Sequence, residues 1–131
     1  MNAQTERLTL SGPAGAIEAV RDSATLADGA APRGVAIIAH PHPLFGGTMD
    51  NKVVQTLARA FVQCGWTAVR FNFRGVGATA GVYDEGRGEL QDLLAVVEQV
   101  APAAAGQPLA LAGFSFGAFV TSHALEALWP T

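Results

Sequence analysis

The chain has 131 residues, 50% of them hydrophobic, and a formal net charge of -3 at pH 7. This length predicts a single domain, and the apolar content is high enough to build a core, which excludes a disordered chain. The modest acidic charge, without a basic block, argues against nucleic acid or a membrane as a partner.

Two weakly alternating segments begin the chain. Residues 6–10 and 16–21 are separated by a Ser-Gly-Pro turn, which predicts two antiparallel strands. Ala, Asp, Gly and Pro dominate residues 23–33, a composition typical of a surface loop. The continuous apolar run over residues 34–39 predicts a short strand that is buried on both faces.

Helix and strand patterns alternate through the middle of the chain. Apolar residues at helical spacing predict a helix over residues 51–64, which Gly65 would cap at its C-terminus. Residues 66–73 read as a strand, and residues 74–81 form a glycine-rich loop. An apolar stripe at i, i+3, i+4 and i+7 predicts the next helix, and its members are Leu90, Leu93, Leu94 and Val97.

A last strand and helix follow a breaker at residues 102–108. Residues 109–113 form a short apolar strand, and residues 116–128 form a helix. Strands that alternate with helices indicate an α/β fold, with a mostly parallel sheet and helices on both faces. The carboxyl ends of the parallel strands then share one rim, where the glycine- and histidine-rich loops would gather.

The motif Gly-Phe-Ser-Phe-Gly lies between the last predicted strand and helix. This is the setting of a nucleophile elbow, a tight turn that holds its central residue in a strained conformation. Gly113 and Gly117 would let strand and helix approach closely, and Ser115 is the candidate nucleophile. The alternative is a strand–helix contact without chemistry, in which Phe114 and Phe116 are ordinary core residues.

Three blocks of sequence resemble the α/β-hydrolase superfamily. They are HPHPLFGGTMDNKVV at 40–54, FNFRGVGATAG at 71–81 and LAGFSFGA at 111–118. Within it, the chain resembles a branch of small bacterial hydrolases that carry a His-Pro-His-Pro loop after the third strand. The resemblance implies attack of the serine on an ester-type carbonyl of a small acyl substrate, an acyl-enzyme, and a histidine base and acid placed after the serine.

The resemblance also implies an oxyanion hole. One donor would be the backbone N–H of Phe116, and the other would come from the loop after the third strand. The prolines of that loop have no N–H, so the candidates are His42 and Leu44, and His42 is favoured by its offset from the strand. Phe45, Phe114 and Phe116 are expected to line an apolar acyl pocket, and Gly46-Gly47 would let the loop turn sharply.

His40 and His42 have a second interpretation as a pair of metal ligands. A catalytic zinc site needs three protein ligands, and no further histidine lies nearby. We therefore expect neither a metal nor an organic cofactor, and we interpret His40 as a buried ring that braces the loop by hydrogen bonding.

The catalytic base and acid are missing from this pattern. His123 is the only histidine after Ser115, and roughly 12 Å of helix rise keeps it from the serine. The sequence therefore predicts one incomplete domain, the N-terminal part of a hydrolase of roughly 200 residues. The other explanation is a short form without activity that pairs with a partner, such as a second copy, through the open edge of strand 109–113.

The remaining rim residues are expected to be structural. Asp50 and Asn51 suit a helix cap, and Arg74 and Asp92 suit hydrogen bonds around the rim. The run that starts at Arg74 lacks the Gly-x-Gly-x-x-Gly spacing, so nucleotide binding is not predicted. With no visible secretory signal or transmembrane stretch, we expect a soluble cytoplasmic protein.

Overall fold

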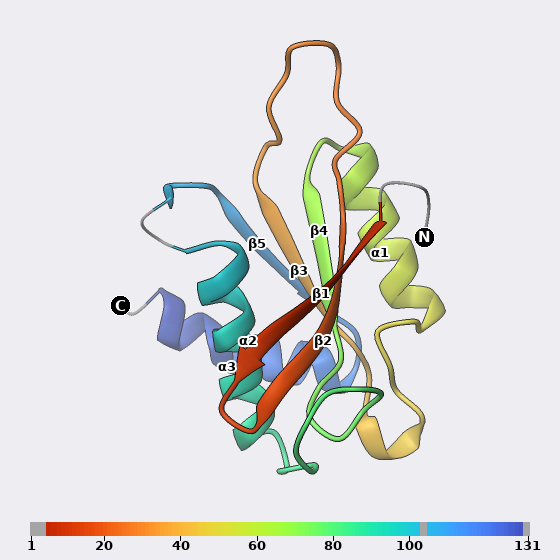
Figure 1. The fold of residues 1–131 in the computed structure, drawn as a ribbon, viewed down its shortest axis with the longest axis vertical. Coiled ribbons are helices and arrows are strands. Elements are labelled where there is room, and N and C mark those ends of the chain that lie inside the picture. The colour runs from red at the N-terminus through yellow and green to blue at the C-terminus, as the bar shows by residue number, and fades with distance from the viewer. Residues whose placement is uncertain (1–4, 103–104, 130–131) are drawn as a thin grey trace.

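The computed structural model describes residues 5–102 and 105–129. Five strands form one sheet in the order β1-β2-β4-β3-β5, with helices on both faces (Figure 1). The strands are β1 (Thr5–Gly12), β2 (Gly15–Asp22), β3 (Val35–Ala39), β4 (Thr67–Phe71) and β5 (Leu109–Gly113). The helices are α1 (Lys52–Gln63), α2 (Arg87–Val100) and α3 (Phe116–Leu128), and a 3₁₀ turn, η1, covers Pro43–Phe45.

The sheet combines a hairpin with a parallel core. β1 and β2 are antiparallel, and β2 also pairs antiparallel with β4. β3 runs parallel to both β4 and β5. Every predicted strand is therefore present, although β4 ends two residues early. The N–H of Asn72 still donates to Glu18 O on β2, whereas the N–H of Phe73 donates to the His40 ring instead of the neighbouring strand.

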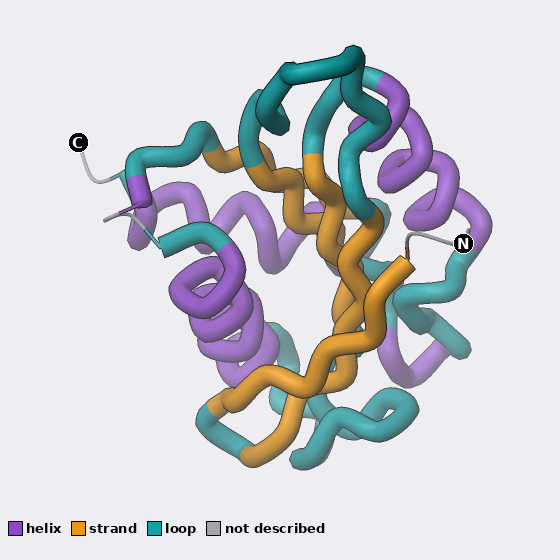
Figure 2. The backbone as a smooth tube through the Cα atoms, turned by 45° about the horizontal axis from the view of Figure 1, so that its top comes forward, coloured by secondary structure: helices purple, strands orange, loops and turns teal. Residues whose placement is uncertain are grey.

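The strand β3 lies at the centre of the core. All five of its residues are buried, as the sequence predicts for a strand covered on both faces. Ile37 faces α2 and α3 on one side of the sheet, whereas Ile38 faces α1 on the other. Figure 2 shows the strands as one twisted layer between these helices.

The helices begin and end close to the predicted positions. Asn51 caps α1, because its side-chain oxygen accepts from the N–H groups of Val53 and Val54 at 2.9 and 3.2 Å. Gly65 follows the helix at φ +89°, which a residue with a side chain adopts only with strain. None of the helices in the described part of the chain has the length and hydropathy needed to cross a bilayer.

The strand β5 forms one border of the sheet. It pairs with β3, and among residues 5–102 and 105–129 no strand lies on its other side. All five of its residues are only half-buried, in contrast to those of β3. The open edge that the sequence predicts is therefore present within the described chain.

Candidate active site

Ser115 occupies the turn from β5 into α3. Its side chain is exposed, and its backbone has φ +58° and ψ -119°. A non-glycine residue held in such a region carries of the order of 1–3 kcal/mol of strain, which persists only where neighbouring contacts enforce it. Here the carbonyl of Ser115 accepts from the N–H groups of Ala118 and Phe119 at 2.9 and 3.1 Å. The turn therefore has the conformation expected of an elbow.

Two glycines allow this turn to pack against the sheet. A Cβ atom on Gly113 would lie 2.5 Å from the carbonyl carbon of Gly117. A Cβ atom on Gly117 would lie 2.2 Å from the carbonyl oxygen of Ala39 at the end of β3. Both contacts are with backbone, so any side chain at these positions would push α3 away from the sheet.

Phe116 is the first residue of α3. The first N–H groups of a helix have no acceptor within the helix, and the helix dipole makes that end favourable for negative charge. The ring of Phe116 lies 4.8 Å from the ring of His42, measured between centroids. The elbow and the loop after β3 are therefore side by side at the carboxyl ends of their strands, as predicted.

The loop after β3 folds around the carbonyl oxygen of His42. This oxygen accepts from the N–H groups of Phe45 and Gly47 at 3.1 and 3.0 Å. The N–H of Leu44 donates to His42 Nδ1 at 3.1 Å, so that donor is engaged by the histidine ring. The two candidate oxyanion donors are backbone N–H groups. That of Leu44 already donates to the His42 ring, whereas that of His42 makes none of the hydrogen bonds of this turn.

The glycine pair in this loop is needed for its shape. Gly46 has φ +83°, and a Cβ atom on Gly47 would lie 2.0 Å from the carbonyl oxygen of Pro41. The chain therefore closes back on Pro41 only because position 47 has no side chain.

His40 is fully buried at the base of the same loop. Its Nε2 atom accepts from the N–H of Phe73 at 3.0 Å, which leaves Nδ1 to donate to the carbonyl oxygen of Pro41 at 2.7 Å. Burial lowers the pKa of His40 to about 4, although the hydrogen bond to Pro41 acts in the opposite direction. The ring is therefore neutral, and it ties the end of β3 to the end of β4, which is the bracing role predicted from the sequence.

Comparison with known proteins identifies this arrangement. The sequence signature of the serine aminopeptidase S33 family matches residues 30–130. The chain belongs to this family. A solved α/β serine hydrolase without a lid, from Xanthomonas campestris, is 45% identical with a TM-score of 0.89, and the match covers 99% of this chain. An α/β serine hydrolase homologue from Coxiella burnetii is 43% identical with a TM-score of 0.87 over 98% of this chain.

This S33 family member spans only part of its relatives' length. It covers 59% of the Xanthomonas hydrolase and 60% of the Coxiella homologue. An uncharacterized protein of Rickettsia prowazekii is 41% identical over 117 residues, which are 87% of this chain and 47% of the relative. The chain corresponds to the N-terminal part of the α/β-hydrolase fold.

Tyr83 was not singled out by the sequence analysis, but it contacts the site of this S33 family member. Its hydroxyl lies 3.2 Å from His42 Nε2, and the two rings are 5.0 Å apart. Because His42 Nδ1 accepts from Leu44, the neutral ring carries its proton on Nε2 and donates it to Tyr83 Oη. No periodic pattern in the sequence connects residue 83 with residue 42, so only the fold shows this contact.

Arg74 and Asp92 form the predicted structural contact behind the rim. Arg74 Nε and Nη2 donate to the two carboxylate oxygens of Asp92 at 3.0 and 2.8 Å. This hydrogen bonding raises the pKa of Arg74. Gly88 of α2 makes room for the pair, since a Cβ atom there would lie 2.3 Å from Arg74 Cζ. The loop after β4 is thus anchored to α2.

The other candidate residues have separate positions. Phe45 is 85% exposed and Phe114 is 40% exposed, so neither is enclosed in a pocket of the described chain. His123 is exposed on α3, where its ring lies 4.7 Å from that of Phe119. Asp50 was predicted to cap α1 together with Asn51, and for Asp50 this prediction is wrong. Its Oδ1 atom lies 3.4 Å from Arg70 Nη1 instead. In the described ranges no group of three His, Cys, Asp or Glu residues could hold a metal ion.

Proposed function

We propose that this protein is a serine hydrolase that cleaves an ester-type acyl substrate through an acyl-enzyme at Ser115. The observation that carries the proposal is the exposed serine at φ +58° on the turn between β5 and α3, beside the loop that contains His42. Membership of the serine aminopeptidase S33 family supports hydrolysis as the reaction class.

In the proposed first step, Ser115 Oγ attacks the carbonyl carbon and its proton passes to a base. The carbonyl oxygen becomes an oxyanion that the N–H groups of Phe116 and His42 hold. The alcohol leaves with a proton, and water then attacks the acyl-enzyme to release the acid. Removing one such oxyanion donor typically lowers kcat by about 10²–10³.

We place the base and the acid in the part of the relatives' length that this chain does not span. Both ring nitrogens of His40 are used in hydrogen bonds, and both of His42 have partners. His123 lies two turns along α3 from the elbow. These three rings are therefore poor candidates for the base.

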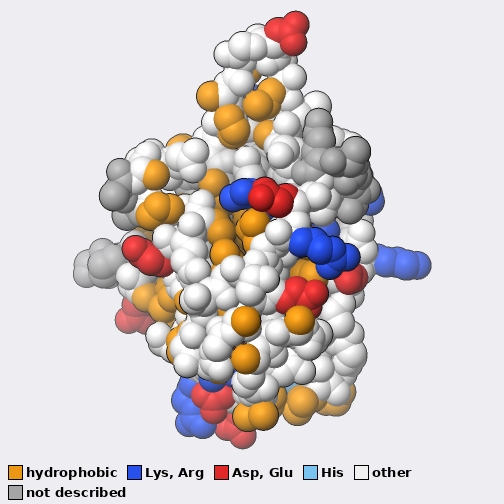
Figure 3. Space-filling model, in the orientation of Figure 1, with side chains coloured by type: hydrophobic (Ala, Val, Ile, Leu, Met, Phe, Trp, Pro, Cys, Tyr) orange, Lys and Arg blue, Asp and Glu red, His pale blue; other side chains and the backbone are white. Residues whose placement is uncertain are grey.

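An apolar acyl group is the proposed substrate feature. Leu44, Phe45 and Val82 are 63%, 85% and 78% exposed. They lie on η1 and on the loop next to Tyr83, and apolar side chains are visible along the lower edge of the molecule (Figure 3). Exposed apolar groups beside a reacting serine favour an apolar ligand. The family description raises a peptide amide as a competing substrate, because the same acyl transfer cleaves it.

Labelling by a fluorophosphonate tests the nucleophile. In the full-length protein we expect stoichiometric labelling of Ser115, none in Ser115→Ala, and turnover of a short-chain aryl ester. If an aminoacyl anilide is cleaved faster than the ester, the proposed substrate class changes from an ester to a peptide. Labelling at another residue with Ser115 untouched would overturn the proposal.

A non-catalytic module that depends on a partner is the second candidate. It is favoured by the half-buried residues of β5, whose outer edge is free of strands in the part of the chain described. Turnover by the 131-residue chain that exceeds its Ser115→Ala variant would exclude this candidate. A monomeric elution volume on size exclusion would argue against pairing between copies.

A further inference from the structure

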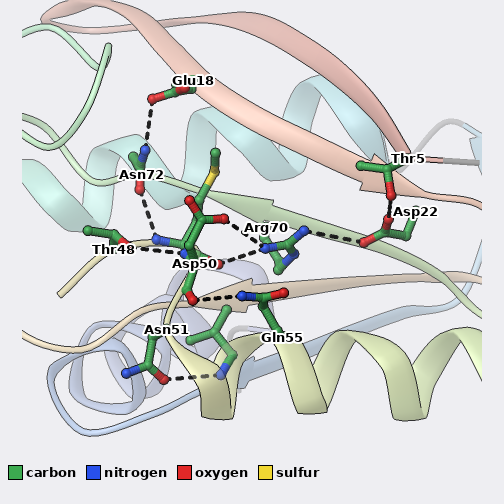
Figure 4. A network of polar contacts seen from close by, with 11 residues as sticks. Thr5, Glu18, Asp22, Thr48, Asp50, Asn51, Gln55, Arg70 and Asn72 are labelled. Atoms are coloured by element: carbon green, nitrogen blue, oxygen red, sulfur yellow. Dashed lines mark hydrogen bonds and ion pairs between the residues drawn. The ribbon is translucent and has the colours of Figure 1, made fainter. Parts of the chain in front are cut away.

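We infer that Arg70 and Asn72 are positioning residues that hold the loop carrying the His42 N–H. Both side chains make hydrogen bonds to the backbone of Met49, near the end of that loop, and Figure 4 shows Arg70 and Asn72 within one network of polar contacts. This inference rests on the proposed function, because it assigns a role in placing the proposed oxyanion donor. Neither residue was singled out in the sequence.

The Met49 backbone makes a hydrogen bond in each direction. Its N–H donates to Asn72 Oδ1 at 2.9 Å, and its carbonyl oxygen accepts from Arg70 Nη1 at 2.8 Å. Residues 70 and 72 lie two positions apart on an extended chain, so their side chains point to the same face of the sheet. All three residues are buried, with exposed fractions of 4% for Met49, 2% for Arg70 and 4% for Asn72.

The amide of Asn72 is held in one orientation. Its Nδ2 group donates to Glu18 Oε1 at 2.9 Å, and the same oxygen accepts from the N–H of Ala78 at 2.8 Å. The Thr79 hydroxyl donates to the carbonyl oxygen of Asn72 at 2.8 Å. Strand β2 and the loop after β4 therefore fix Asn72 with its oxygen toward Met49.

The guanidinium of Arg70 is buried between two carboxylates. Asp22 Oδ2 lies 3.6 Å from Nη2, and Asp50 Oδ1 lies 3.4 Å from Nη1. Arg70 lines a cavity of about 500 Å³ between the β1–β2 hairpin and residues 48–50. Two carboxylates face its charge, and Arg70 Nε and Asp22 Oδ2 have no hydrogen-bond partner in the described chain. A buried charge is costly unless it is well paired, and the hydrogen bond to the Met49 carbonyl is the shortest polar contact of the Arg70 side chain in the described chain.

The hydrogen bonds connect this contact to the site. At the near end of the loop, the N–H of Phe73 holds the His40 ring. At the far end, Asn72 and Arg70 hold Met49. Only one residue separates Met49 from Gly47, and the N–H of Gly47 donates to His42 O at 3.0 Å. The end of β4 thus holds both ends of the loop. Misplacement of a catalytic group by 1 Å can cost about 10²-fold in rate.

Hydrogen exchange on the 131-residue chain tests whether Arg70 and Asn72 hold Met49, and it requires no measurement of enzyme activity. The variants are Asn72→Ala and the pair Arg70→Met with Asp22→Asn, which avoids an uncompensated carboxylate. We expect the amides of residues 42–49 to exchange at least about tenfold faster, whereas those of β3 stay protected. Arg21→Met, which breaks an exposed ion pair of β2 with Glu6, is the matched control and leaves the loop unchanged. Unchanged loop exchange in both variants would overturn the inference.

Kinetics in the full-length protein test the positioning role. With active sites counted by fluorophosphonate, kcat per site should fall at least about tenfold while KM stays the same, because an oxyanion donor acts in the transition state. Arg70→Lys keeps a donor toward Met49 and should recover part of the loss, whereas a defect in folding would only lower the number of sites. An unchanged kcat per site would overturn the role. If the wild-type protein is not labelled at Ser115, the proposed function fails. The exchange result alone then decides whether Arg70 and Asn72 hold the loop.

Discussion

The ring of His42 lies 4.8 Å from the ring of Phe116, which brings the loop after β3 against the first turn of α3. These two residues are 74 positions apart in the chain, yet each would supply one backbone N–H to the same oxyanion. Their rings therefore fix the relative position of the two proposed donors.

Substitution Gly117→Ala should destabilise the protein by about 1–3 kcal/mol, the usual effect of overpacking. The added Cβ atom would lie 2.2 Å from the carbonyl oxygen of Ala39, and neither backbone can move without separating α3 from β3. Urea denaturation measures the change. Glu126→Ala on the exposed side of α3 is the control, with an effect within about 0.5 kcal/mol. Equal stabilities of the two variants would show that the close approach is relaxed in solution.

Substitution Ser115→Gly should stabilise the fold by about 1 kcal/mol relative to Ser115→Ala, because glycine adopts positive φ without steric cost. Both variants should lose fluorophosphonate labelling, because neither has the serine hydroxyl. Thermal denaturation of the two variants in parallel gives the comparison. If alanine is as stable as glycine at this position, the turn does not store strain.

Acid should weaken the fold through His40. The pKa of His40 is about 4 in the folded protein against 6.5 in the unfolded chain, so the unfolded state binds the proton more readily. The stabilisation from the neutral ring is complete above pH 6.5 and is lost as the pH falls toward 4. The free energy of unfolding should fall by at most about 3 kcal/mol through this group. Denaturation curves at several pH values should show this loss in the wild-type protein and in His123→Gln. His40→Gln should lack this component, and an identical pH dependence in that variant would contradict the assignment.

Substitution Arg74→Met should cost about 3–5 kcal/mol, because the buried Asp92 carboxylate loses its partner, whereas Asp92→Leu should cost less, because Arg74 is only partly buried. The double variant Arg74→Met with Asp92→Leu should be markedly more stable than Arg74→Met alone. A double-mutant cycle by urea denaturation measures the coupling. Arg87→Ala breaks only exposed ion pairs with Asp84 and Glu85 and should change stability by less than about 1 kcal/mol. Additive single effects at Arg74 and Asp92 would rule out the coupling.

Local patterns in the sequence identified the elbow and most of the elements. The Gly-x-Ser-x-Gly motif overlaps the end of β5 and the start of α3, and the periodicity of α1 and α2 is regular. The hydrogen bonds of Arg70 and Asn72 to Met49, and of Tyr83 to His42, link residues that are 21 to 41 positions apart. Their residue types follow no spacing rule, since the fold rather than the local chain brings the partners together. Local sequence also could not show which of two neighbouring residues caps α1. Asn51 is the cap, whereas the side chain of Asp50 lies near Arg70.

The strand order has a consequence for biosynthesis. The four adjacent strands β1, β2, β4 and β3 are complete once residue 71 has been made, whereas β5 joins the sheet next to β3 only after residue 113. Because a ribosome synthesises the chain from its N-terminus, every residue of these four strands is present before Ser115 is made. We therefore expect the Ser115 turn to dock onto the described sheet after its four other strands have been synthesised.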